Sequence, residues 1–294
     1  MNLKGKNAVI TGGSSGIGFE TARFLCQRGV QVYLAVRDPD KGWVAEKEIK
    51  SENPEASIES LVLDLADLES IQFFAESFSR HAGTLDLLIN NAGVMVPPYQ
   101  KTRDGFELQF GTNHLGHFAL TGHLLPHIAK TSESRVITLS SLAHRKAEID
   151  FDNLDGENGY RAMKFYGQSK LANLLFALEL DERFKKHGIQ AKSIACHPGI
   201  AVTNLFKIGR KDAPGWLKKA AAPFLQTAEM GALPVIYAAE NENLNGGEYI
   251  GPDGRGSRKG FPVIETVNHP SRSDNTGKRL WEVSEEMTGV SYLQ

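Results

Sequence analysis

Short apolar runs alternate along most of the chain with longer segments in which apolar residues recur at helical spacing. The runs are rich in Val, Ile and Leu, and their length is typical of β-strands buried on both faces. They cover residues 7–11, 31–36, 58–64, 85–90, 135–140, 190–196 and 248–250. The helical spacing is clearest at Ile17, Thr21, Phe24 and Leu25, and again at Leu171, Leu174, Leu175 and Leu178.

This alternation predicts an α/β protein with a parallel sheet and helices on both faces. We expect one doubly wound Rossmann-type domain over residues 1–294, with a seven-stranded parallel sheet. The sequence has no internal repeat, no low-complexity tract and no linker long enough to separate two domains.

Two regions depart from the alternating pattern. Residues 203–227 mix apolar and basic side chains and are punctuated by Pro214, Gly215 and Pro223. The apolar ones are Leu205, Phe206, Trp216, Leu217, Phe224 and Leu225. We predict that this segment covers a substrate, and a loop that simply packs against the protein is the alternative.

The second region is the chain after Gly251, which is irregular until Asp274. Asp274 could cap a last helix that contains Leu280, Trp281, Val283 and Met287.

Bulk properties restrict the function classes further. A charge balance of 33 − 35 = −2 gives no electrostatic case for nucleic acid or an anionic membrane. No run of 18 apolar residues occurs, so no membrane span is expected. We also expect no signal peptide, and two reduced core thiols at Cys26 and Cys196, as in a cytoplasmic protein. A homo-oligomer stays open.

A glycine-rich turn follows the first predicted strand, in Thr11-Gly12-Gly13-Ser14-Ser15-Gly16-Ile17-Gly18. Gly12 suits a tight turn, and Gly16 and Gly18 allow close approach of a phosphate and a neighbouring strand. The N-terminus of the next helix offers free N–H groups to a pyrophosphate. The turn therefore predicts a dinucleotide site, and an ordinary tight turn is the alternative.

The second predicted strand ends in Val36-Arg37-Asp38. An acidic residue at this tip would bind the ribose 2′-hydroxyl of NAD, whereas a guanidinium can grip a 2′-phosphate. Arg37 therefore favours NADP(H), with a solvated loop cation as the alternative. Asp38 could pair with Arg37, or could itself turn inward to the cofactor, so NAD remains a possible cofactor.

Tyr166 and Lys170 are four residues apart in a predicted helix and so share one face. A tyrosine has a pKa near 10 and needs help to exchange a proton at neutral pH. A nearby ammonium lowers that pKa. An acid beside a nicotinamide indicates hydride transfer to or from a carbonyl. The alternative is a surface tyrosine stacked on a lysine stem.

The spacing Gly-x-x-x-Gly-x-Gly resembles that of the short-chain dehydrogenase/reductase superfamily, and the resemblance covers nearly the whole chain. Further motifs occur in the superfamily's order. They are Asp64 with Leu65, Asn90-Asn91-Ala92-Gly93, Asn113, Ser140-Ser141, Tyr166 with Lys170, Pro198-Gly199, and Thr203. Many NADP-using members have a basic residue in the glycine turn where this chain has Ser14 and Ser15, so the NADP prediction depends on Arg37.

The resemblance implies a role for each catalytic residue. Tyr166 exchanges the proton, Lys170 also binds the nicotinamide ribose, and Ser141, with Ser140 as runner-up, bonds the substrate oxygen. Asn113 would hold a water that relays protons, or else bond the backbone as a helical Asn does. The implied cofactor-binding set is Gly12, Ser14, Ser15, Gly16, Ile17, Gly18, Arg37, Asp64, Leu65, Asn91, Ala92, Gly93, Tyr166, Lys170, Pro198, Gly199 and Thr203.

The interval from Ser141 to Tyr166 is 25 positions, about twice the gap common in the superfamily. The extra residues, 144–159, are acidic and include Glu148, Asp150, Asp152, Asp155 and Glu157. This form resembles the retinol dehydrogenase-like branch, as does Asn113-His114-Leu115-Gly116-His117-Phe118. That branch includes membrane-anchored retinoid enzymes and light-dependent protochlorophyllide reductases.

We therefore predict an oxidoreductase that transfers hydride between NADP(H) and an apolar aldehyde or ketone, or the corresponding alcohol. Alternatives are a light-dependent C=C reductase of a tetrapyrrole and a non-catalytic NAD(P)-binding redox sensor, although sensors usually lose the tyrosine or lysine. Helical spacing of His114, His117, His123 and His127 is like that of metal ligands. No cysteine or carboxylate cluster accompanies them, so we predict no metal.

Overall fold

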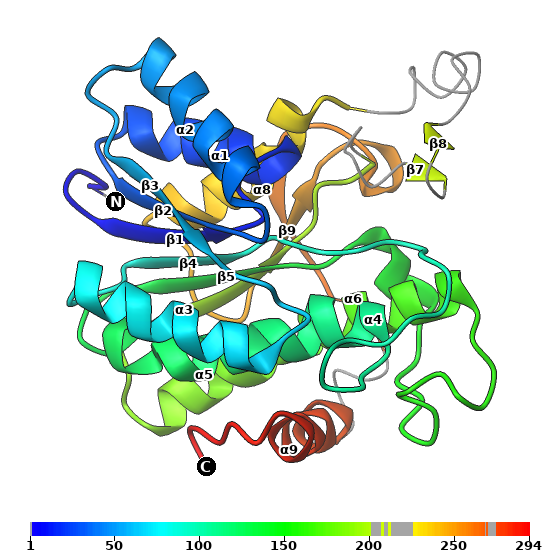
Figure 1. Ribbon diagram of the computed structural model, residues 1–294. Helices are drawn as coiled ribbons and strands as arrows, with labels where there is room; N and C mark the ends of the chain where they lie inside the picture. Colours follow the sequence, from blue (N-terminus) through cyan, green and yellow to red (C-terminus); the bar gives the residue numbers. More distant parts are fainter. Residues whose placement is uncertain (1, 201–206, 209–210, 213–225, 268, 270–274) are drawn as a thin grey trace.

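The computed structural model describes residues 2–200, 207–208, 211–212, 226–267, 269 and 275–294. Thr203, Asp274 and nearly all of the predicted substrate-covering segment 203–227 lie outside these residues. A single Rossmann-like sheet runs through the molecule, with helices on both of its faces (Figure 1).

The sheet has eight strands in the order β10-β9-β6-β5-β4-β1-β2-β3. Their bounds are β1 Asn7–Thr11, β2 Gln31–Val36, β3 Ile58–Val62, β4 Leu87–Asn90, β5 Arg135–Leu139, β6 Lys192–Cys196, β9 Tyr249–Pro252 and β10 Pro262–Glu265. The first seven in chain order are parallel, and β10 is antiparallel to β9. Strand β1 pairs with β2 on one side and β4 on the other, which creates a crevice at its carboxyl end.

The predicted count of seven strands is wrong by one. The parallel strands match the seven predicted runs, but β10 was not predicted. It is an edge strand whose Val263 and Ile264 are exposed, so it lacks the apolar run that marks a buried strand. A separate two-stranded pair consists of β7 Lys207–Ile208 and β8 Lys211–Asp212.

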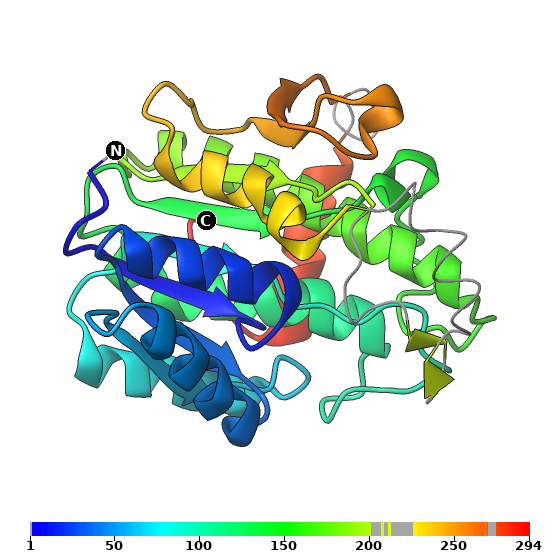
Figure 2. The ribbon, with the colours of Figure 1, turned by 90° about the horizontal axis from the view of Figure 1, so that it is seen from above.

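Two helical layers enclose the sheet, as Figures 1 and 2 show. One face carries α1 Gly16–Gln27, α2 Pro39–Glu52 and α8 Ala228–Glu240. The other carries α3 Leu68–His81, α5 Gly116–Ile128 and α6 Ala162–Lys186. Alternate residues of one strand feed the two layers, so Ala8 and Ile10 of β1 belong to one core cluster and Val9 to the other.

The predicted last helix is present as α9, Thr276–Thr288, with Asn275 as its N-cap. It packs outside α6 and α5, away from the sheet (Figure 1). Trp281 is buried, stacks on Phe176 at a centroid distance of 5.9 Å and meets Phe118 edge-on at 5.0 Å. Tyr292 completes this aromatic cluster, 4.8 Å from Trp281. The aromatic cluster therefore covers the outer side of the α5–α6 layer.

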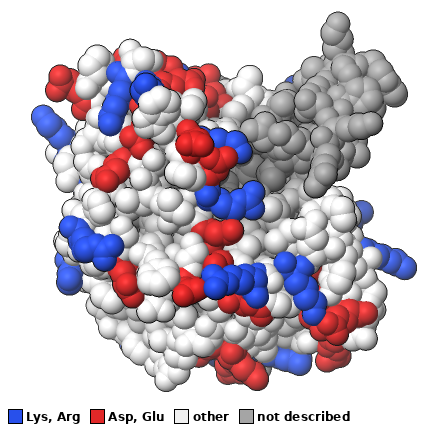
Figure 3. All heavy atoms as spheres, in the orientation of Figure 1, with Lys and Arg blue, Asp and Glu red and all other residues white. Residues whose placement is uncertain are grey.

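The surface is electrostatically mixed. Basic and acidic side chains are interspersed over the face in Figure 3, in line with the net charge of −2. Within the described residues, no helix has the length and apolarity needed to cross a membrane. Cys26 and Cys196 are both buried and free, as predicted, and burial raises the pKa of each thiol.

Candidate active site

The glycine turn between β1 and α1 has the geometry of a phosphate cradle. Gly12 and Gly16 adopt φ of +66° and +59°, a region that side chains disfavour. A Cβ on Gly18 would lie 2.6 Å from both the Asn91 Nδ2 atom and the Gly12 carbonyl oxygen. The N-cap, Ser15, makes no side-chain capping hydrogen bond, and the first turn of α1 has no acidic residue. Free N–H groups and a bare backbone at this helix N-terminus fit a dinucleotide pyrophosphate.

Thr11 ties this turn to the neighbouring strand end. Its hydroxyl oxygen accepts the N–H groups of Asn91 and Ala92, each at 2.9 Å. It also lies 2.8 Å from the His117 Nε2 atom. Because His117 Nδ1 faces the carbonyl of Asn113 at 2.9 Å, Nδ1 carries the proton and Nε2 accepts from Thr11. Burial lowers the pKa of His117 to about 4, so the ring is neutral.

The residues at the tip of β2 separate into two roles. Arg37 is exposed, and no described residue forms an ion pair with its guanidinium. Asp38 instead caps α2, accepting from the N–H groups of Asp40 and Lys41, and it also pairs with the Lys41 ammonium at 2.9 Å. Asp38 therefore neither pairs with Arg37 nor turns inward.

At the end of β3, Asp64 and Leu65 border the same crevice. The Asp64 carboxylate accepts from the N–H of Ala66 at 2.9 Å and thereby fixes the turn. Leu65 is buried against α5, where a Cβ on Gly116 would collide with the Leu65 carbonyl oxygen. The absence of a side chain at Gly116 thus allows the helix to approach this loop.

Tyr166, Ser141 and Lys170 meet at the carboxyl ends of β4 and β5. Tyr166 is 7% exposed, and its phenol hydrogen-bonds the Ser141 hydroxyl. The Lys170 ammonium lies 6.0 Å from the centre of the Tyr166 ring. Burial raises the pKa of Tyr166, and the hydrogen bond from Ser141 acts in the opposite direction. The predicted lowering of this pKa by Lys170 stays a prediction.

Lys170 is nearly fully buried, and burial lowers its pKa to about 8. Its Nζ donates to the Leu139 carbonyl at 3.2 Å, and the side-chain amide of Asn173 donates to the same oxygen at 2.9 Å. Gly93 lies beside it, since a Cβ there would be 3.4 Å from Nζ. Asn173 was not among the predicted site residues, although its position three residues after Lys170 places both on one helix face.

Ser140 and Ser141 point to different partners. The Ser140 hydroxyl donates to the main-chain carbonyl of Lys170 at 2.7 Å and is buried. The Ser141 hydroxyl faces Tyr166 and accepts the N–H of Ala143 at 3.2 Å. The geometry therefore favours Ser141 over Ser140 as the serine that contacts a substrate.

Asn113 lies in a π-helical turn, Gly111–Leu115, between α4 Leu108–Phe110 and α5. Its amide clamps the backbone of Val94 through bonds of 2.7 and 3.0 Å, and it donates to the Ser169 hydroxyl at 3.0 Å. This is the backbone-bonding arrangement that the sequence left open. The predicted role in holding a relay water stays a prediction.

The turn after β6 closes the far side of the crevice. Gly199 has φ of +66°, and the Pro198 carbonyl accepts from the side-chain amide of Gln226. Together with the glycine turn, Arg37 and the 91–93 strand end, these residues line the carboxyl edge of the sheet, where nucleotides bind in doubly wound folds. Thr203 lies outside the described residues.

The described catalytic and glycine-turn residues all lie within residues 6–213, the range matched by the sequence profile of the family described as short chain dehydrogenase. The chain belongs to the short-chain dehydrogenase family. It is an NAD(P)-dependent dehydrogenase/reductase that acts on alcohol or carbonyl groups, and it falls in the retinol dehydrogenase-like branch.

Full-length relatives support the branch. Mouse (Mus musculus) retinol dehydrogenase 11 is 42% identical over 99% of this chain and 88% of the relative. Human (Homo sapiens) retinol dehydrogenase 13 is 37% identical over 98% of this chain and 86% of the relative. The crystal structure of an uncharacterized protein from Mycobacterium paratuberculosis, 37% identical, superposes with a TM-score of 0.82 over 99% of this chain and 96% of that one.

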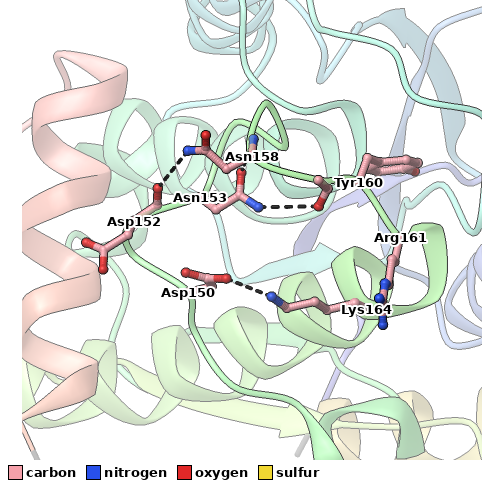
Figure 4. Close-up of a pocket in the computed structure, with 8 residues that line it drawn as sticks. Asp150, Asp152, Asn153, Asn158, Tyr160, Arg161 and Lys164 are labelled. Carbon is pink, nitrogen blue, oxygen red and sulfur yellow. Dashed lines mark hydrogen bonds and ion pairs between the residues drawn. The ribbon is translucent and has the colours of Figure 1, made fainter.

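The acidic insertion of this short-chain dehydrogenase precedes the catalytic helix. It forms a short 3-10 helix, Leu142–Lys146, and then a loop that, with the start of α6, surrounds an open hollow of about 520 Å³ (Figure 4). Two of its acidic residues are paired, Asp150 with Lys164 at 2.7 Å and Glu157 with Lys101. These pairs hold the loop against its neighbours.

The histidines of α5 and its π-turn have separate partners. His114 Nε2 meets the Ser284 hydroxyl at 2.9 Å, and His127 Nε2 meets the Ser79 hydroxyl at 2.8 Å. Burial lowers the pKa of His114 to about 3. No group of three metal-ligating side chains comes together in the part of the chain that the structure describes.

Proposed function

We propose that this enzyme transfers a hydride between NADP(H) and an apolar aldehyde or ketone, or the corresponding alcohol, with Tyr166 as the proton donor or acceptor. The observation that carries the proposal is the meeting of Tyr166, Ser141 and Lys170 beside the glycine cradle. The nicotinamide, when bound, supplies or accepts the hydride.

Ser141, Tyr166 and Lys170 then bind the substrate oxygen and move the proton. A carbonyl oxygen placed between Ser141 and Tyr166 receives a hydrogen bond from each hydroxyl, and Tyr166 gives up its proton as negative charge develops. The buried ammonium of Lys170 stabilises the resulting phenolate. In alcohol oxidation the same groups act in reverse, and the phenolate takes the proton.

NADP(H) is the proposed cofactor because Arg37 extends from the tip of β2 and Asp38 is occupied at the cap of α2. A guanidinium can bind the three oxygens of a 2′-phosphate through paired hydrogen bonds. The proposed binding set is the one that the sequence predicts, including Thr203.

An apolar substrate is supported by relatives named as retinol dehydrogenases, since retinol is a long polyene alcohol. It is also supported by the composition of 203–227, which we propose as the segment that covers the substrate in this one-domain enzyme. Its six large apolar side chains would exclude water at about 25 cal/mol per Å² of buried apolar surface. We place the enzyme in the cytoplasm.

The deciding experiment is kcat/KM across a graded series, from short aldehydes to polyene and polycyclic carbonyls, with both NADPH and NADH. We expect activity to rise with apolar area, first through KM. Phe206→Ala and Trp216→Ala should weaken large substrates more than small polar ones. A preference for sugars or hydroxy acids that these variants leave unchanged would contradict the substrate class.

An absorption spectrum, assays with and without light, and nucleotide titration, run beside this panel, separate the two alternatives. A light-dependent tetrapyrrole reductase would bind a pigment with a visible absorption band and turn over only under illumination. A redox sensor would bind the nucleotide tightly with no turnover of any carbonyl. Retention of both Tyr166 and Lys170 favours the dehydrogenase over the redox sensor.

A further inference from the structure

His197 directly follows β6 and is completely buried. Its Nδ1 atom accepts the N–H of Gly199 at 3.1 Å, and its Nε2 atom lies 2.9 Å from a carboxylate oxygen of Glu265. A backbone N–H can only donate, so Nδ1 must be unprotonated. Nε2 therefore carries the proton and donates it to Glu265, which fixes the tautomer of the ring.

Glu265 belongs to the antiparallel edge strand β10, and its second oxygen is held as well. Arg145 contacts that oxygen at 3.2 Å. The same guanidinium donates to the Ser257 hydroxyl at 2.9 Å and the Gly256 carbonyl at 3.2 Å. Arg145 lies four residues after Ser141, so its guanidinium links Glu265 and the β9–β10 connection to the loop that carries the catalytic serine.

The sheet has space for this pair because β9 has a glycine there. A Cβ on Gly251 would collide with both the Nε2 atom of His197 and the carboxylate of Glu265. The turn itself is equally confined, since a Cβ on Gly199 would collide with the carbonyl oxygen of Arg258. The N–H of Ile200 donates to that carbonyl at 2.8 Å. The turn at 198–200 is therefore held by two hydrogen bonds, from Gly199 to His197 and from Ile200 to Arg258.

A second histidine, His144, packs the loop that carries Ser141 against strand β9. The Nδ1 atom of His144 lies 2.7 Å from the Ser141 carbonyl oxygen, to which it donates. The ring of Tyr249, on β9, lies 5.4 Å from His144 and 5.1 Å from His197. The loop that carries Ser141 and the turn at 198–200 are thus both packed, through their histidines, against the ring of Tyr249.

We propose that His197 is a positioning residue, held in one tautomer by Glu265, which fixes the Pro198–Gly199 turn and so the part of the cofactor that this turn contacts relative to Tyr166. This inference rests on the proposed function, in which Pro198 and Gly199 contact the cofactor. The phosphate end of the cofactor is held elsewhere, by the glycine turn. Loss of His197 therefore lowers kcat much more than it lowers cofactor affinity.

Two substitutions at one position separate the turn from simple packing. In His197→Asn, the side-chain oxygen can accept from the N–H two residues later, as in an Asx turn, and the bond to Gly199 is kept. In His197→Leu that bond is lost. We expect His197→Leu to lower kcat about 10- to 100-fold, since small misplacements cost up to about 100-fold. His197→Asn should keep most of the wild-type kcat. In both variants the Kd for NADPH should stay within about threefold of the wild-type value.

The matched control is His187→Leu, because His187 is exposed beyond the end of α6. It should leave kcat unchanged. Equal loss of kcat in His197→Asn and His197→Leu, or a loss confined to Kd, would overturn the proposal. If the wild type turns over no alcohol or carbonyl at all, the proposed function fails instead.

A measurement without turnover tests the tautomer directly. In protein labelled with ¹⁵N-histidine, the His197 signals, assigned by their disappearance in His197→Asn, should show a proton on Nε2 and none on Nδ1. Glu265→Ala should abolish that single-tautomer pattern. A proton on Nδ1 in the wild type would overturn the assignment, even where His197→Leu fails to fold.

Discussion

The Lys170 ammonium lies 6.0 Å from the centre of the Tyr166 ring and donates to the carbonyl of Leu139. The two side chains share one face of α6, as their spacing predicts. Ser141, from the end of β5, supplies the hydrogen bond to the phenol. The lysine and the hydrogen-bonding serine therefore reach Tyr166 from different elements, α6 and the turn after β5.

Replacing Tyr166 by Phe should remove the proton donor and leave the fold intact. We expect kcat to fall about 10²- to 10⁴-fold, the usual contribution of a positioned acid or base. The Kd for NADPH, measured by fluorescence titration, should change little because the substitution leaves the glycine turn, the proposed phosphate site, unchanged. Near-normal turnover on the best carbonyl substrate would show that another group supplies the proton.

Lys170→Met should lose activity and gain stability in the absence of nucleotide. Burial lowers the pKa of Lys170 from 10.5 to about 8, so below pH 8 the folded state keeps a charge that it disfavours by about 3 kcal/mol. Between pH 8 and 10.5 the folded lysine is neutral while the unfolded one is still charged, so the wild type gains stability with rising pH. Loss of the bond to Leu139 offsets part of the gain.

Urea unfolding of both proteins from pH 6 to 10.5 measures this difference. The advantage of Lys170→Met should be largest below pH 8 and shrink above it. A constant difference across that range would mean that burial does not lower the pKa of Lys170.

NADPH should bind more tightly than NADH, and Arg37→Ala should remove most of the difference. Losing a charge-assisted contact costs about 1.5–3 kcal/mol, roughly 10- to 150-fold in Kd. Arg80→Ala is the control, because Arg80 is exposed in the last turn of α3, where the neighbouring His81 pairs with Glu59 near the amino end of β3. Direct titration of the wild type and both variants with NADPH and NADH measures these Kd values. Tighter binding of NADH than of NADPH by the wild type would contradict the proposal of NADP(H) as the cofactor.

Trp281→Ala should destabilise the protein by about 3–5 kcal/mol, as large truncations in cores do. The side chain is 2% exposed and packs on Phe118, Phe176 and Tyr292. Trp43→Ala, at a tryptophan 56% exposed, should cost less than about 1 kcal/mol. Equal midpoints for the two variants in denaturant would show that α9 contributes little to the core.

Much of this architecture was predictable because its signals are local. The seven parallel strands are apolar runs, and the glycine turn and the Tyr166–Lys170 spacing fix their own geometry. What the sequence concealed depends on partners distant along the chain. Strand β10 forms only against β9, and the pairing of His197 with Glu265 spans 68 positions. Likewise, no spacing rule shows that the Asn113 amide clamps Val94.

The aromatic cluster beneath α9 also has a consequence for biosynthesis. The Tyr292 hydroxyl donates to the carbonyl of Phe118 at 3.1 Å, across 174 positions of sequence. The layer containing Phe118 and Phe176 therefore cannot be completed until residue 292 has left the ribosome. Long-range closure of this kind slows folding and leaves apolar surface exposed in the meantime. When every strand of the sheet has been synthesised, Phe118 and Phe176 therefore still lack the cover that Trp281 and Tyr292 provide.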